Sequence, residues 1–173
     1  MNILPQSAVV FGLICLIVSP STLAGLTPDQ EIAKTTGIAL FNQYKAISAV
    51  PHLKIAAHAG DHEAQYYLGE AIRNNKRYMT TEAQTAYEAS AAIGDVYSMI
   101  RLGQASDDLC VKMNNCPKAQ RTPKQWMDLA NKTANQGVER GNAESMYLMY
   151  KKTGDDEWIE NQRRMDSRLL SSA

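Results

Sequence analysis

A glycine-centred pattern recurs three times along the chain and constrains the fold more than any other feature. Each copy has a glycine followed by Asp or Asn, a small residue four places past the glycine and an apolar residue eight places past it. Glycine accepts the left-handed conformation that ends a helix, and the Asp or Asn side chain then caps the next helix. Each copy therefore predicts a corner between two helices. The corner glycines are Gly60, Gly94 and Gly141.

The spacing of the corners indicates a repeat architecture. Thirty-four residues separate the first two glycines, and 47 separate the last two. A unit of two helices of this length cannot bury its apolar faces alone, so it stacks on its neighbours. The sequence therefore predicts an all-α fold made of antiparallel helix pairs.

The residues around the first two corners resemble a known family. They read Ala56-Ala57, Gly60, Ala64 and Leu68-Gly69, then Ser90-Ala91, Gly94, Ser98 and Leu102-Gly103. This pattern resembles the Sel-one-like repeats, which are short relatives of tetratricopeptides. The resemblance covers roughly residues 45–160, and the third copy departs from it at Gly137-Val138 and Met149-Tyr150. It implies a short right-handed α-solenoid that binds other proteins.

Helix-start signals place the elements along the chain. Thr27 and Thr122 each precede a proline and stand three residues before a glutamine, the pattern of a capping box with proline in the first turn. The repeat units are expected near 45–75, 79–105 and 123–152, with a loop at 106–121 and a C-terminal capping helix. The predicted helices are 28–48, 51–59, 62–75, 81–93, 96–105, 123–136, 142–152 and 156–170.

Residues 1–24 have the layout of a secretory signal peptide. An apolar run of 11 residues from Ala8 to Val18 is about half the length that crosses a bilayer. Ser19 and Pro20 break the run, and small residues then precede Gly25, as at a cleavage site. The run has no Lys or Arg before it, so an uncleaved buried helix is the alternative. Cleavage would leave residues 25–173 as a repeat domain in the periplasm, without stable membrane insertion.

Two cysteines remain once the signal peptide is removed, Cys110 and Cys116. An even count in an oxidising compartment favours a disulfide, which here would pin one loop. Idle thiols, a pair of zinc ligands or a redox pair are the alternatives. The spacing is not Cys-x-x-Cys, and no second Cys or His pair stands nearby.

The sequence offers little for catalysis or for nucleic acid. Its 18 basic residues balance 18 acidic ones, which argues against a nucleic-acid partner. His58 and His62 have the spacing of a zinc-protease motif, but Gly60 and Asp61 interrupt the helix between them. The chain carries no nucleophile elbow and no phosphate loop. We expect no enzyme activity, no metal and no cofactor.

A protein partner is the remaining expectation. Tyr67 and Arg101 are predicted to lean toward the concave side of the array, where such side chains form interface hot spots. Trp126 is a third candidate anchor, with a buried Trp126 as the alternative. Asp107 and Asp108 are expected to act as rim charges that steer a basic partner to the loop at 107–118.

A second resemblance suggests what the partner is. The tract from Asp108 to Trp126, followed by the stretch from Ala143 to Trp158, resembles periplasmic Sel-one-like proteins encoded beside type VI secretion lipase effectors. Those proteins confer immunity by binding the incoming phospholipase and blocking it. The alternative is a structural adaptor of the cell envelope. A cysteine-rich, penicillin-hydrolysing enzyme of the kind known among related repeats is disfavoured, because that class has a cysteine pair in each repeat.

Overall fold

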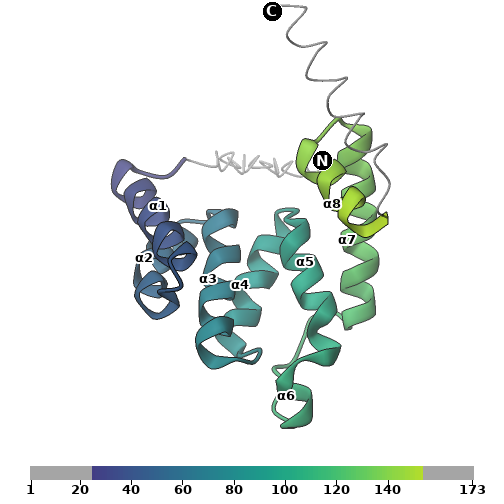
Figure 1. Ribbon diagram of the computed structural model, residues 1–173, viewed down its shortest axis with the longest axis horizontal. Helices are drawn as coiled ribbons and strands as arrows, with labels where there is room; N and C mark the ends of the chain where they lie inside the picture. Colours follow the sequence, from purple (N-terminus) through teal and green to yellow (C-terminus); the bar gives the residue numbers. More distant parts are fainter. Residues whose placement is uncertain (1–24, 154–173) are drawn as a thin grey trace, which may run out of the picture.

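A computed structural model of the protein describes residues 25–153, and within this range the chain folds into helices and contains no strand (Figure 1). The predicted all-α class is confirmed. The predicted signal peptide, residues 1–24, and the predicted capping helix, 156–170, lie outside the described residues. The helices are α1 (Pro28–Asn42), α2 (Ala46–His58), α3 (His62–Lys76), α4 (Thr81–Ala92), α5 (Val96–Gly103), the 3-10 helix η1 (Gln104–Asp107), α6 (Leu109–Lys112), α7 (Pro123–Glu139) and α8 (Ala143–Thr153).

Consecutive helices pack against one another. The principal neighbours are α1 and α2, α2 and α3, α3 and α4, α4 and α5, α5 and α7, and α7 and α8. Figure 1 shows the helices following one another across the molecule in chain order. Within residues 25–153, none of the helices is both long and apolar enough to cross a membrane.

The three glycine corners share one backbone geometry. After α2, the N–H of Gly60 donates to the carbonyl of Ala57 at 3.1 Å, and the N–H of Asp61 donates to the carbonyl of Ala56 at 3.2 Å. These are the two bonds of a Schellman motif, and the same pair recurs after α4 and after α7. The glycine φ angles are 91° at Gly60, 104° at Gly94 and 76° at Gly141.

The residue after each corner glycine caps the next helix, as predicted. The side chain of Asp61 accepts a hydrogen bond from the backbone N–H of Ala64 at 2.7 Å. Asp95 and Asn142 cap α5 and α8 in the same way. The residue after the glycine therefore completes the end of one helix with its backbone N–H and caps the start of the next helix with its side chain. This double role fixes the angle between the two helices at each corner.

The predicted helix over 28–48 is wrong, because the chain turns at Tyr44. α1 ends at Asn42 and α2 begins at Ala46. The corner is again a Schellman motif, in which Lys45 N–H donates to the Leu40 carbonyl at 2.9 Å, but Tyr44 occupies the glycine position at φ 60°. Pro51, expected to start the second helix of 51–59, lies inside α2. The sequence has no glycine at this corner, and α2, which packs against both α1 and α3, contains the proline.

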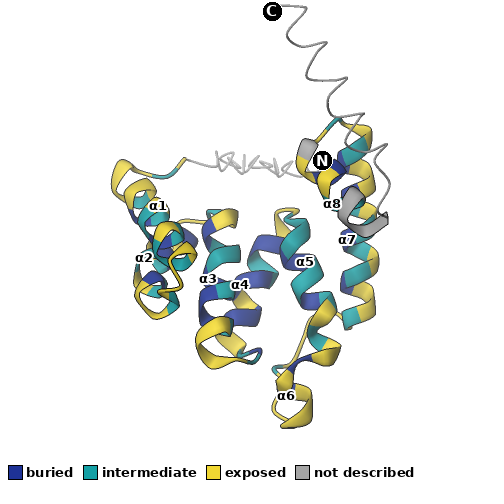
Figure 2. Ribbon diagram, viewed as in Figure 1, coloured by how far each residue is buried: buried dark blue, intermediate teal, exposed yellow. Residues whose placement is uncertain are grey.

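Small residues let the helices approach closely. The glycines in α1, α3 and α5 each face a large side chain of α2, α4 and α7, respectively, and a Cβ added at the first two would lie 2.7 Å from that side chain. The facing pairs are Gly37 with Leu53, Gly69 with Tyr87, and Gly103 with Met127. Figure 2 shows the resulting buried strip along α3, α4, α5 and α7.

Candidate partner-binding surface

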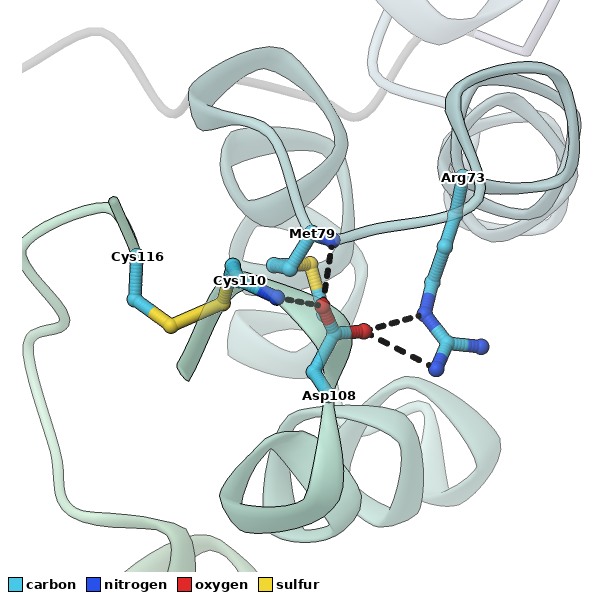
Figure 3. The surroundings of a disulfide bond; sticks show 5 residues. All are labelled: Arg73, Met79, Asp108, Cys110 and Cys116. Carbon is cyan, nitrogen blue, oxygen red and sulfur yellow. Dashed lines mark hydrogen bonds and ion pairs between the residues drawn. A yellow bond between two sulfur atoms is a disulfide. The ribbon is translucent and has the colours of Figure 1, made fainter. Parts of the chain in front are cut away.

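The loop between α5 and α7 is closed by a disulfide. Cys110 and Cys116 are joined, with their Cα atoms 4.7 Å apart, as the cysteine count predicted (Figure 3). The loop was expected to be without helix, but η1 and the short helix α6 form inside it. A disulfide that closes so few residues adds about 2 kcal/mol to the free energy of unfolding in the chain-entropy model. Other contacts must therefore place the loop on the rest of the molecule.

Asp108 makes those contacts. Its Oδ1 accepts hydrogen bonds from the backbone N–H groups of Met79, at 2.8 Å, and Cys110, at 3.0 Å. Its Oδ2 pairs with the guanidinium of Arg73 on α3 at 3.0 Å (Figure 3). The carboxylate thus caps α6 and ties the loop to the end of α3 and to the connection before α4.

The electrostatics of Asp108 follow from these partners. The residue is 3% exposed, and burial alone would raise the pKa of its carboxyl. The hydrogen bonds from Cys110 and Met79, together with the Arg73 charge, outweigh burial and leave the pKa of Asp108 below its ordinary value. Asp108 is therefore a buried tether and not the rim charge that the sequence suggested.

The other half of the loop is held by α4. The side-chain amide of Gln84 donates to the carbonyl of Lys118 at 2.9 Å, and the N–H of Gln120 donates to Glu88 at 3.3 Å. The loop is consequently fixed at both ends as well as across its middle. Such a loop loses little conformational entropy when a partner binds.

The fixed loop presents apolar side chains to solvent. Leu109, Val111 and Met113 are 43%, 50% and 43% exposed, whereas Cys110 between them is buried. Asn114, at φ 51°, turns the chain back toward Cys116. We refer to residues 109–113 as the loop knob. Sequence reasoning missed these three side chains, because the sequence alone does not show that they stay exposed beside the buried Cys110.

A second surface feature is a hollow lined by tyrosines. It has a volume of about 440 Å³ and lies at the N-terminal ends of α3, α5 and α8. The ring of Tyr66 packs edge-on against Tyr67 at 5.3 Å between centroids and lies 5.9 Å from Tyr97. Burial, followed by the charge of Glu70, raises the pKa of Tyr66 to about 12, so this ring stays neutral. We call this hollow the tyrosine cleft, and its lining residues are His62, Glu63, Tyr66, Tyr67, Asp95, Tyr97 and Glu144.

The predicted anchor Arg101 makes an ion pair within the fold. Its guanidinium makes a two-pronged ion pair with Glu70 on α3, at 2.5 Å from Nε and 2.9 Å from Nη2. The hydroxyl of Tyr87 donates to the same carboxylate at 2.8 Å, which links α4 to the pair. Burial, and then the Glu70 charge, raises the pKa of Tyr87. Arg101 thus links α5 to α3, while 36% of its side chain stays exposed.

The other residues predicted to bind a partner lie in different parts of the structure. Trp126 is 3% exposed and lies in the core, so the alternative of a buried Trp126 is correct. The Cζ atom of Arg121 lies 4.9 Å from the centroid of the Trp126 ring. Tyr67 is half-buried and lines the tyrosine cleft. Asp107 is exposed at the edge of the loop. The structure therefore divides the predicted set between the loop and the cleft.

The described residues offer no cluster of three or more His, Cys, Asp and Glu side chains that could hold a metal. His58 and His62 are both exposed, on either side of the Gly60 corner. In comparisons with known proteins, the chain matches no family model, no curated protein and no solved structure.

Proposed function

We propose that this protein is a protein-binding helical-repeat module, built as a short right-handed α-solenoid of Sel-one-like helix pairs. Three features support the repeat interpretation: identical corner motifs, identical helix caps, and a glycine in α1, α3 and α5 that faces a neighbouring helix. The glycine of α1 extends the repeat to the first helix pair, before the range of the sequence resemblance.

The functional proposal depends on the loop knob. Three large apolar side chains stand exposed on a segment that a disulfide, a buried ion pair and two contacts from α4 hold in place. Exposing them costs free energy in water, and the surrounding contacts keep them from turning inward. A rigid apolar projection of this kind suits an interface, where it fills a pocket on a partner.

The partner we propose is a phospholipase toxin, in line with the sequence resemblance. An enzyme that takes phospholipid acyl chains must present an apolar entrance to its active site, and an apolar knob has the chemistry to cover that entrance. The mechanism is occlusion without turnover. The disulfide suits an oxidising compartment, and we place the protein in the periplasm after removal of residues 1–24.

The test removes the apolar character of the knob. A variant carrying Leu109→Ser, Val111→Ser and Met113→Ser should fold as the wild type does but bind the proposed phospholipase partner at least about a hundredfold more weakly. The matched control replaces three exposed isoleucines of α1 and α2, Ile32, Ile47 and Ile55, by serine. Affinity for the purified phospholipase and residual phospholipid hydrolysis are measured for each.

Equal affinity of the knob variant and the wild type would contradict the proposal. A loss confined to the isoleucine control would move the interface to α1 and α2. If the wild type binds no phospholipase, the protein is instead a scaffold of the cell envelope.

A further inference from the structure

The tyrosine cleft combines aromatic faces with negative charge that is only partly neutralised. Among the described residues that line it there are three carboxylates, Glu63, Asp95 and Glu144, but no Lys or Arg. Glu63 already pairs with Lys34 at 2.8 Å. Within residues 25–153, neither Asp95 nor Glu144 makes an ion pair.

The charges in the cleft repel one another. Burial, and then the charge of Asp95, raises the pKa of Glu144, with Glu63 adding to the effect and His62 opposing it. Each carboxylate stands at the start of a helix, where it complements the helix dipole.

We propose that the tyrosine cleft receives an arginine side chain of the bound protein. The proposal rests on the proposed function and names a second point of contact for the same partner. A guanidinium stacks on tyrosine faces and pairs with carboxylates in the same plane. Tyr67 and Tyr97 supply the faces, and Glu144 with Asp95 supplies the charge. The hollow, with a volume of about 440 Å³, has room for both the guanidinium and the methylene chain of an arginine side chain.

The cleft lies partly on the first half of α3, and the loop knob is tied to the last turn of the same helix. Tyr66 and Tyr67 belong to the first half of α3, whereas Arg73, which holds the knob through Asp108, belongs to its last turn. Because a helix rises 1.5 Å per residue, about 10 Å along α3 separates these positions. A single protein of ordinary interface size reaches both.

The experiment uses a blocked peptide, acetyl-Gly-Arg-Gly-amide, and its citrulline counterpart, which has the same shape without the charge. Each is titrated into the nitrogen-15-labelled exported protein, and backbone amide shifts are followed by NMR. We expect saturable shifts at residues 62–67 and 95–97 with the arginine peptide, and about tenfold weaker binding of the citrulline peptide.

Variants identify the charges responsible. Glu144→Gln and Asp95→Asn each remove a carboxylate, and asparagine still caps α5. Both should weaken the arginine peptide about tenfold. Glu139→Gln, an exposed carboxylate of α7 outside the cleft, is the control and should leave binding unchanged.

Equal shifts with both peptides, shifts elsewhere, or Glu144→Gln and Asp95→Asn variants that bind as the wild type does would overturn the inference. So would variants that lower only the melting temperature, because the carboxylates would then serve their own helices alone. If knob variants abolish phospholipase binding while the arginine peptide fails to bind, only this inference falls. If the peptide binds and the knob variants bind the phospholipase normally, only the proposed function falls.

Discussion

At the scale of single residues, Asp108 decides where the loop knob stands. One buried carboxylate caps α6, accepts from the Met79 N–H and pairs with Arg73. Removing it would leave a buried N–H without its acceptor and a guanidinium without its partner. The loss of such a group costs more than the pair itself contributes, since the orphaned partners stay desolvated.

The first prediction follows from the lowered pKa of Asp108. Its unfolded pKa is about 3.9 and its folded pKa is lower, so its contribution to stability is fully present above about pH 4 and is lost as the pH falls through the folded value. Asp108→Asn should lower the free energy of unfolding at about pH 7 by about 1–2 kcal/mol, and the variant should lose less stability than the wild type on acidification. Urea unfolding at about pH 7 and about pH 3 measures both.

Asp107→Asn is the matched control for this prediction, because its side chain is exposed one residue away. It should change neither the stability nor its pH dependence appreciably. Parallel pH profiles for Asp108→Asn and the wild type would mean that the carboxylate does not hold the loop.

At the scale of elements, the same backbone hydrogen-bond motif recurs at the corners between helices. The glycine corners and the Tyr44 corner have the same two backbone bonds, yet the first three carry the residue best suited to positive φ and the fourth does not. A tyrosine there is strained by about 1 kcal/mol. Its side chain is 94% exposed, so core packing does not compensate.

The second prediction exchanges these residues. Gly94→Ala should lower the free energy of unfolding by about 1–2 kcal/mol, and Tyr44→Gly should raise it by about 0.5 kcal/mol. A Cβ at Gly94 would meet nothing within 4 Å, so its cost is conformational and not a clash. Chemical denaturation of each variant checks the signs. A Gly94→Ala protein as stable as the wild type would contradict the assignment of strain to the backbone.

The corners also explain what the sequence could and could not predict. Gly60, Gly94 and Gly141 were found because glycine followed by Asp or Asn announces both a helix end and a helix start. Tyr44 was missed because its conformation is imposed by the packing of α1 on α2 and not by its own preference. The disulfide followed from cysteine count, which does not depend on packing.

The candidate site was less predictable than the fold, for a physical reason. Whether a polar or aromatic side chain faces solvent or a partner helix depends on contacts between residues far apart in the chain. Asp108 is buried by Arg73 and Met79, and Arg101 is engaged by Glu70, more than 25 residues away in each case. Local patterns place such residues on a helix or in a loop but do not name those partners.

At the scale of the whole molecule, the protein has two surface features of opposite character that the proposed partner would contact. The loop knob is apolar and projects from the connection between α5 and α7, as the position of α6 in Figure 1 shows. The tyrosine cleft is acidic and lies across α3, α5 and α8. Apolar contact supplies affinity, and charge complementarity supplies orientation and a faster approach.

The proposed role of the loop knob is tested most directly by amide hydrogen exchange of the protein alone and in complex with the proposed phospholipase partner. We expect binding to slow amide exchange in the segment 107–118, and also at residues 62–67 and 95–97, while exchange in α2 is unchanged. The knob variant with three serines should lose this protection. Protection confined to α1 and α2, with unchanged exchange at 107–118, would contradict the claim that the loop knob is the site of contact.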